Sequence, residues 1–129
     1  TAMNSLKRSE VFDKNLTEKF VQFCCENLKA FPNKLEIDEY LVNDNTTGLC
    51  VDFDDDNFLI LVRVKNRNLT QIYTTIAHEL VHVKQHMYDN LNDLLLYNNG
   101  NLNTWWEKEA YEKSDKLVEN FITFFQNSR

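Results

Sequence analysis

The chain has 129 residues, 43% of them hydrophobic and 26% charged, which is the composition of a folded, soluble domain and excludes a disordered one. Its length matches one domain over residues 1–129, long enough to bury a hydrophobic core without disulfides. The formal net charge of -6 argues against nucleic acid and anionic membranes as partners, because both would repel the surface. A local basic strip of Arg63, Lys65 and Arg67 is interpreted as a solvated strand edge.

Three further features bear on the compartment. No window holds the roughly 18 apolar residues of a membrane span, and the N-terminus lacks the pattern of a signal peptide. Cys24, Cys25 and Cys50 follow no disulfide or zinc-ribbon spacing, so we expect reduced thiols and a cytoplasmic location, in the host cell if the protein is viral. Abundant asparagine beside 2 glycines and 1 proline is associated with AT-rich genomes and is consistent with a viral or phage origin.

The N-terminal half predicts one helix followed by a small sheet. Residues 1–9 are polar and are expected to form a flexible tail, in which the two residues before Met3 are an expression remnant. Apolar residues at three- and four-residue intervals predict an amphipathic helix over residues 10–30. Three extended segments then predict an antiparallel meander, over residues 35–42, 48–53 and 58–65.

The C-terminal half predicts two helices joined by a loop. An apolar stripe predicts a helix over residues 69–88, and the asparagine-rich segment 89–103 is expected to be largely loop. Thr104 and Glu107 form a capping-box pattern, so the last helix is expected to begin at Trp105 and to end near the C-terminus. The predicted fold class is α+β, with an N-terminal helix, an antiparallel sheet of about three strands, and a motif-bearing helix packed against the C-terminal helix.

The predicted helix over residues 69–88 contains the sequence His78-Glu79-Leu80-Val81-His82. The spacing places the two imidazoles one turn apart on the same face, where both can bind one metal ion. Glu79 is rotated by about 100° around the axis, so its carboxylate can reach a metal-bound water without being a ligand. This pattern predicts a zinc site with Glu79 as general base, although the same spacing also arises by chance on ordinary helices.

A catalytic zinc ion needs a third protein ligand and one open position. No histidine follows His86, so a carboxylate is expected, and the candidates in the last predicted helix are Glu107, Glu109 and Glu112. Glu107 and Glu109 are about 200° apart around a helix, so they cannot both face the same ion. His86 lies about 12 Å from His78 along the axis, too far to bind that ion as well.

The two motifs together, His78-Glu79-Leu80-Val81-His82 and Trp106-Glu107-Lys108-Glu109-Ala110-Tyr111, resemble a compact gluzincin. In that family a glutamate is followed three residues later by a small residue, which matches Ala110 and makes Glu107 the zinc ligand, with Glu109 as the alternative. The resemblance implies a minimal zincin-like fold that binds Zn²⁺ and hydrolyses peptide bonds in a protein or peptide substrate.

Other roles follow from the same resemblance. Many gluzincins carry an acid where this chain has Tyr111, so either its hydroxyl or another group is expected to orient a zinc histidine. Tyr97, Tyr111 and His86 are the candidates for stabilising the transition state. The substrate is expected to run antiparallel to residues 58–65, the strand before the motif helix.

Two other classes of function remain open. The chain could be a binding or adaptor domain that keeps the gluzincin fold without proteolysis, or a hydrolase or toxin-like domain that acts on a nonpeptide bond. Glu79 is intact, which favours an enzyme, because a purely structural zinc site has no use for a base.

Overall fold

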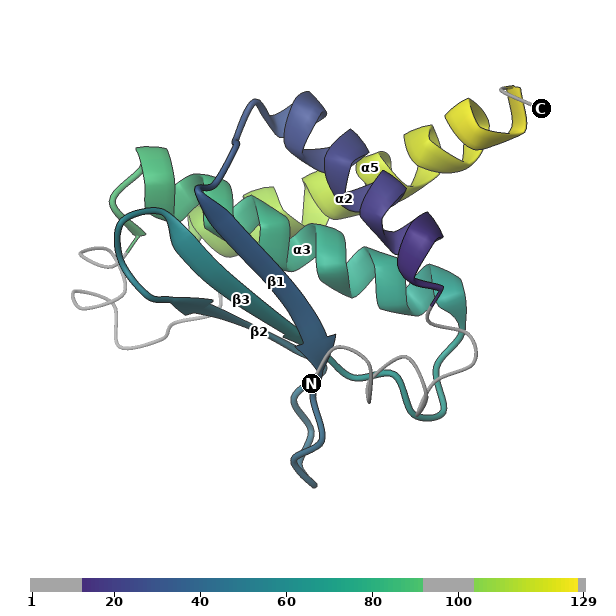
Figure 1. Cartoon of the computed structure of the whole chain (residues 1–129), viewed down its shortest axis with the longest axis horizontal. Helices are drawn as coiled ribbons and strands as arrows, with labels where there is room; N and C mark the ends of the chain where they lie inside the picture. The colour runs from purple at the N-terminus through teal and green to yellow at the C-terminus, as the bar shows by residue number, and fades with distance from the viewer. Residues whose placement is uncertain (1–12, 92–103, 128–129) are drawn as a thin grey trace.

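The computed structural model describes residues 13–91 and 104–127, so the predicted tail over residues 1–9 lies outside the described part (Figure 1). The predicted α+β class is confirmed, with three helices and a three-stranded sheet among these residues. The elements in chain order are helix α2 (Lys14–Leu28), strands β1 (Lys34–Glu39), β2 (Gly48–Asp52) and β3 (Asn57–Val62), and helices α3 (Leu69–Tyr88) and α5 (Trp105–Asn127).

Local interactions set both ends of α2. At its start, the Asp13 carboxylate accepts a hydrogen bond from the backbone N–H of Leu16 at 3.1 Å, as an N-cap does. At its end, Lys29 adopts a left-handed backbone with φ of 54°, and its N–H bonds the carbonyl of Cys25. The helix therefore lies within the predicted range of 10–30.

The three helices meet in an aromatic cluster. The Phe20 ring of α2, fully buried, stacks on the Tyr73 ring of α3 with centroids 4.5 Å apart. It also meets the Phe121 ring of α5 edge-on at 5.0 Å. Aromatic pairs of this kind bury large apolar areas in favourable geometry, so the cluster fixes where α2 crosses the α3–α5 pair.

The sheet is mixed, and the prediction of an antiparallel meander is wrong. Its strand order is β1-β3-β2, with β1 parallel to β3 and β2 antiparallel to it. Strand β3 is apolar along most of its length, and Phe58, Ile60 and Val62 are buried on its inner face, so it occupies the centre. Strand β1 alternates charged and apolar residues, which suits an edge. The chain therefore passes from one edge of the sheet to the other between β1 and β2.

Arg63 holds the segment that connects β1 to β2. Its Nε donates to the carbonyl of Thr46 at 2.8 Å, and its Nη2 donates to the carbonyls of Val42 at 2.6 Å and Asp44 at 2.9 Å. Its guanidinium also lies over the Tyr40 ring, 5.0 Å from the centroid. In the predicted basic strip, the partly exposed Arg63 side chain therefore also organises this connection.

Helices α3 and α5 pack against each other, as predicted, and α3 lies across one face of the sheet (Figure 1). Ala110 of α5 is fully buried, and its small side chain lets the two helices approach closely. The predicted capping box of α5 does not form. The Thr104 hydroxyl has no hydrogen-bond partner among the described residues, and the Glu107 carboxylate turns toward α3 rather than back to the start of its own helix.

None of the helices in the described ranges combines the length and the apolar character needed to cross a lipid bilayer.

Candidate metal centre

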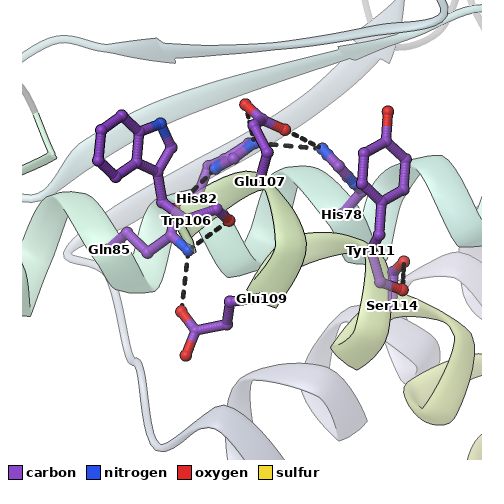
Figure 2. Close-up of polar contacts among 8 residues, drawn as sticks. All are labelled: His78, His82, Gln85, Trp106, Glu107, Glu109, Tyr111 and Ser114. Atoms are coloured by element: carbon purple, nitrogen blue, oxygen red, sulfur yellow. Dashed lines mark hydrogen bonds and ion pairs between the residues drawn. The ribbon is translucent and has the colours of Figure 1, made fainter. Parts of the chain in front are cut away.

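Three predicted ligands converge between α3 and α5. His78 Nε2 lies 3.2 Å from His82 Nε2 and 3.1 Å from Glu107 Oε1, and His82 Nε2 lies 3.4 Å from Glu107 Oε2. The two histidines are one turn apart on α3, and Glu107 reaches them from the first turn of α5 (Figure 2). The structure therefore brings together the two motif histidines and the preferred third candidate.

The spacing of these atoms fits a metal ion. Zinc binds nitrogen and oxygen at about 2.0–2.1 Å in a tetrahedron, whose corners are then about 3.3 Å apart. The two histidine nitrogens, 3.2 Å apart, are close to that edge length, and each of them faces a different oxygen of the Glu107 carboxylate, at 3.1 and 3.4 Å. Two imidazoles and one carboxylate also leave the fourth corner of such a tetrahedron open, as a catalytic zinc site requires.

The electrostatics of the cluster favour a cation. Hydrogen bonds from His78 and His82 lower the pKa of Glu107 to about 2, so its carboxylate is ionised at neutral pH. Burial alone would lower the pKa of His82, but the hydrogen bond with Glu107 and the charge of Glu79 outweigh it and raise the pKa. Glu107 also lies in the first turn of α5, where the helix dipole stabilises negative charge.

Glu79 lies beside this cluster but is not part of it. Its side chain is buried, and it does not belong to the group of three whose ligand atoms converge. Burial raises the pKa of Glu79 above its ordinary value, although the nearby His82 and His78 oppose this shift. A buried carboxylate with a raised pKa next to two metal-ligand candidates is suited to exchanging a proton at neutral pH.

A cavity of about 600 Å³ opens in front of the cluster. Its walls come from β2 and the segment before it, from α3 and from the start of α5. The walls include Thr47, Gly48 and Cys50 on one side and Trp106 and Tyr111 on the other. Glu79 and the three converging residues lie within it, so a bound molecule can reach them.

Strand β2 offers an open edge to this cavity. Arg63 N donates to Thr47 O, so the main-chain groups of Thr47 point toward β3. In an antiparallel pair this direction alternates along the strand, so the main-chain groups of Gly48 and Cys50 point away from β3. Strand β3 has a partner on both sides, so the prediction that a substrate pairs with residues 58–65 is wrong. Of the two edge strands among the described residues, β2 is the one that borders the cavity, so a further extended chain could join the sheet there.

The alternative third ligand, Glu109, lies on another side of α5. Its carboxylate bonds Gln85 Nε2 at 2.8 Å and Lys84 Nζ at 3.2 Å, and it pairs with Lys113 Nζ at 3.2 Å. Figure 2 shows it pointing away from the histidines. The rotation of about 200° between Glu107 and Glu109 explains why only one of them faces α3 on this side.

The other predicted residues have mixed placements. The Tyr111 ring meets the His78 ring edge-on with centroids 4.5 Å apart, so its contact with a zinc-ligand candidate is through the ring. His86 lines the same cavity, 3.5 Å from a carboxylate oxygen of Asp52, and burial lowers its pKa. Tyr97 lies outside the described residues. The roles of Tyr111 and His86 in catalysis stay predictions.

Sequence reasoning missed Gly48, which allows β2 to approach α3. A Cβ added there would lie 2.4 Å from Thr75 Cγ2 and 3.0 Å from Glu79 Oε2. Thr75 in turn accepts a hydrogen bond at 2.7 Å from Nη2 of Arg67, a second member of the predicted basic strip. The only sequence signal was the rarity of glycine, with 2 in the chain. Gly48 therefore sets the distance between the open strand edge and Glu79.

We expect Gly48→Ala to lower the free energy of unfolding by about 1–3 kcal/mol, as overpacking of a core does. Thr75→Ser removes the methyl group that the new Cβ meets and keeps the hydroxyl that binds Arg67. The double variant should therefore recover part of the loss. Urea unfolding of both single variants and the double variant measures this. A Gly48→Ala protein as stable as the native one would contradict the close approach.

Comparison with known proteins gives a distant relationship. No family model matches the chain, and no solved structure matches it either. Over 122 residues the chain is 28% identical to proteins named neutral endopeptidase from Lactococcus lactis subsp. cremoris, from its strain SK11 and from Lactococcus lactis subsp. lactis strain IL1403. The match covers 95% of this chain but 19% of each relative, so the chain spans about a fifth of their length. The chain is thus a distant homologue of neutral endopeptidases, with a triad of side chains that is compatible with a metal site.

Proposed function

We propose that the chain is a zinc-dependent endopeptidase domain over residues 1–129, in which His78, His82 and Glu107 hold the ion and Glu79 is the general base. The observation that carries the proposal is the convergence of one ligand atom each from His78, His82 and Glu107 within 4.8 Å of one another, beside a buried glutamate that does not join them. The distant homology to neutral endopeptidases supports a peptide substrate. When bound, zinc would lower the pKa of a coordinated water and polarise a carbonyl group.

In this proposal, Glu79 takes a proton from the attacking water and passes it to the amine that leaves. Its raised pKa suits both steps, because a carboxyl group whose pKa is nearer to neutrality gains and loses a proton readily. The substrate lies along the open edge of β2, where main-chain groups of Gly48 and Cys50 can pair with an extended peptide. In the proposal, β2 is the strand that pairs with the substrate, in place of residues 58–65.

The proposal also includes a cytoplasmic location. Cys24, Cys25 and Cys50 are all free thiols, which is typical of a reducing compartment.

The experiment that tests the function measures zinc and turnover on the same sample. Protein prepared in metal-free buffer and reconstituted with zinc should contain close to one zinc per chain by elemental mass spectrometry. It should cleave casein or a peptide library, and a chelator should abolish the cleavage until zinc is returned. Bound zinc without cleavage of any peptide would favour an adaptor domain. A folded protein that takes up no zinc would rule the proposal out.

A further inference from the structure

Gln85 connects a candidate zinc ligand to the opposite helix. It lies three residues after His82 on α3 and is fully buried, with 0% of its surface exposed. Its Oε1 lies 2.8 Å from His82 Nδ1, and its Nε2 donates to the carbonyl of Trp106 at 2.9 Å and to Oε1 of Glu109 at 2.8 Å (Figure 2). A buried amide with all of these contacts has little freedom to turn.

These contacts determine which way the Gln85 amide faces. The carbonyl of Trp106 and the carboxylate of Glu109 can only accept hydrogen bonds, so both must receive the two hydrogens of the Gln85 NH₂ group. The amide oxygen is then the atom that faces His82. An amide oxygen is an acceptor, so His82 Nδ1 must carry a proton.

The orientation of the amide thereby sets the tautomer of His82. In a neutral imidazole only one nitrogen is protonated, so a proton on Nδ1 leaves a lone pair on Nε2. That lone pair faces Nε2 of His78 and the carboxylate of Glu107, the two other candidate ligands. A lone pair and a carboxylate that face one another repel unless a proton or a metal cation lies between them.

Two lysines bind the same Glu109 carboxylate that accepts a hydrogen bond from Gln85. Nζ of Lys84 and Nζ of Lys113 each lie 3.2 Å from its carboxylate. Glu109, the alternative ligand in the sequence, is therefore a fixed acceptor behind Gln85.

We propose that Gln85, oriented by Glu109 and the Trp106 carbonyl, is a positioning residue that holds His82 as the Nδ1–H tautomer with Nε2 ready to bind the metal. The inference rests on the proposed zinc site and deepens it. It also supplies an orienting group for a zinc histidine, the role expected from the sequence for Tyr111 or another group. Partners that orient a metal-binding histidine typically change metal affinity by about ten- to a hundred-fold when they are removed.

A purely structural bond between α3 and α5 would have different consequences. Its loss would lower the stability of the protein without changing zinc affinity. Tyr73→Phe provides the matched control, because it removes another buried side-chain bond between two helices. That bond joins Tyr73 to Thr17 of α2 at 3.0 Å and does not involve the candidate ligands.

The test compares Gln85→Met with Tyr73→Phe and with the native protein. Methionine has nearly the shape of glutamine but no strong acceptor, so the core remains filled. Zinc affinity, measured by competition with a chromophoric chelator, should fall by about ten- to a hundred-fold in Gln85→Met and stay native in Tyr73→Phe. Native affinity in a folded Gln85→Met protein would overturn the inference.

Two further measurements keep the inference testable. In the metal-free native protein, ¹⁵N chemical shifts of the His82 ring should show a protonated Nδ1, and the opposite tautomer would overturn the inference. If Gln85→Met fails to fold, Glu109→Ala decides the matter, because it frees one hydrogen of the Gln85 amide and should weaken zinc binding. Failure of the native protein to bind zinc contradicts the proposed function, whereas a native site unaffected by these changes contradicts the role of Gln85 alone.

Discussion

Glu79→Gln should lower kcat/KM for peptide cleavage by about 10² to 10⁴-fold while the zinc content stays at one per chain. The amide has the same shape as the carboxylate, so the close approach of Gly48 is retained. The glutamine amide cannot take a proton from water, so turnover should fall. Zinc should stay bound, because the Glu79 carboxylate is outside the group of converging ligands. Kinetics with a fluorogenic peptide and metal analysis of the same sample measure both quantities.

Two outcomes would contradict this role of Glu79. Loss of zinc from Glu79→Gln would mean that the residue helps to hold the metal. Activity close to native would assign the proton transfer to another group in the cavity, and His86 would then be the first candidate, because it lines the same cavity.

Glu107→Ala should reduce zinc binding by more than about a hundred-fold, because removal of a ligand costs more than removal of a group behind it. Glu109→Ala should still bind one zinc per chain when zinc is in excess. The two residues are on the same helix two positions apart, but only Glu107 lies within 3.1–3.4 Å of the histidine nitrogens. The pair is therefore a matched test of which glutamate completes the site.

Thermal unfolding gives an independent measure of the same prediction. A ligand present at a hundred times its dissociation constant stabilises the folded state by about 2.7 kcal/mol. Excess zinc should therefore raise the Tm of the native protein and of Glu109→Ala, and it should leave the Tm of Glu107→Ala unchanged. An equal rise in all three proteins would show that zinc binds at another place.

The parts of the structure that depend on local pattern could be predicted from the sequence. The four-residue spacing brings the side chains of His78 and His82 together only on a helix. The chain forms that helix over Leu69–Tyr88. The small residue Ala110 pointed to Glu107 through the family resemblance, and in the structure Ala110 is buried and the Glu107 carboxylate lies 3.1 Å from His78 Nε2.

The parts that depend on long-range pairing could not be predicted. Strand order is set by which strand is most apolar over its whole length, and a parallel pair such as β1 and β3 leaves no hairpin signal between its members. The role of Gln85 depends on where α5 places Glu109 and the Trp106 carbonyl, so no pattern around His82 could have indicated it.

The open edge of β2 also bears on how the protein avoids self-association. An exposed strand edge is a template for a second copy, and proteins usually protect such edges with charge or with bulk. Here the edge borders a cavity of about 600 Å³ whose other walls come from α3 and α5, which leaves room for a single extended chain rather than for another sheet. Three exposed aspartates, Asp54, Asp55 and Asp56, follow the strand in left-handed conformations, and the net charge of -6 makes copies repel. The β2 edge can thus leave room for one extended peptide while repulsion between copies disfavours self-association.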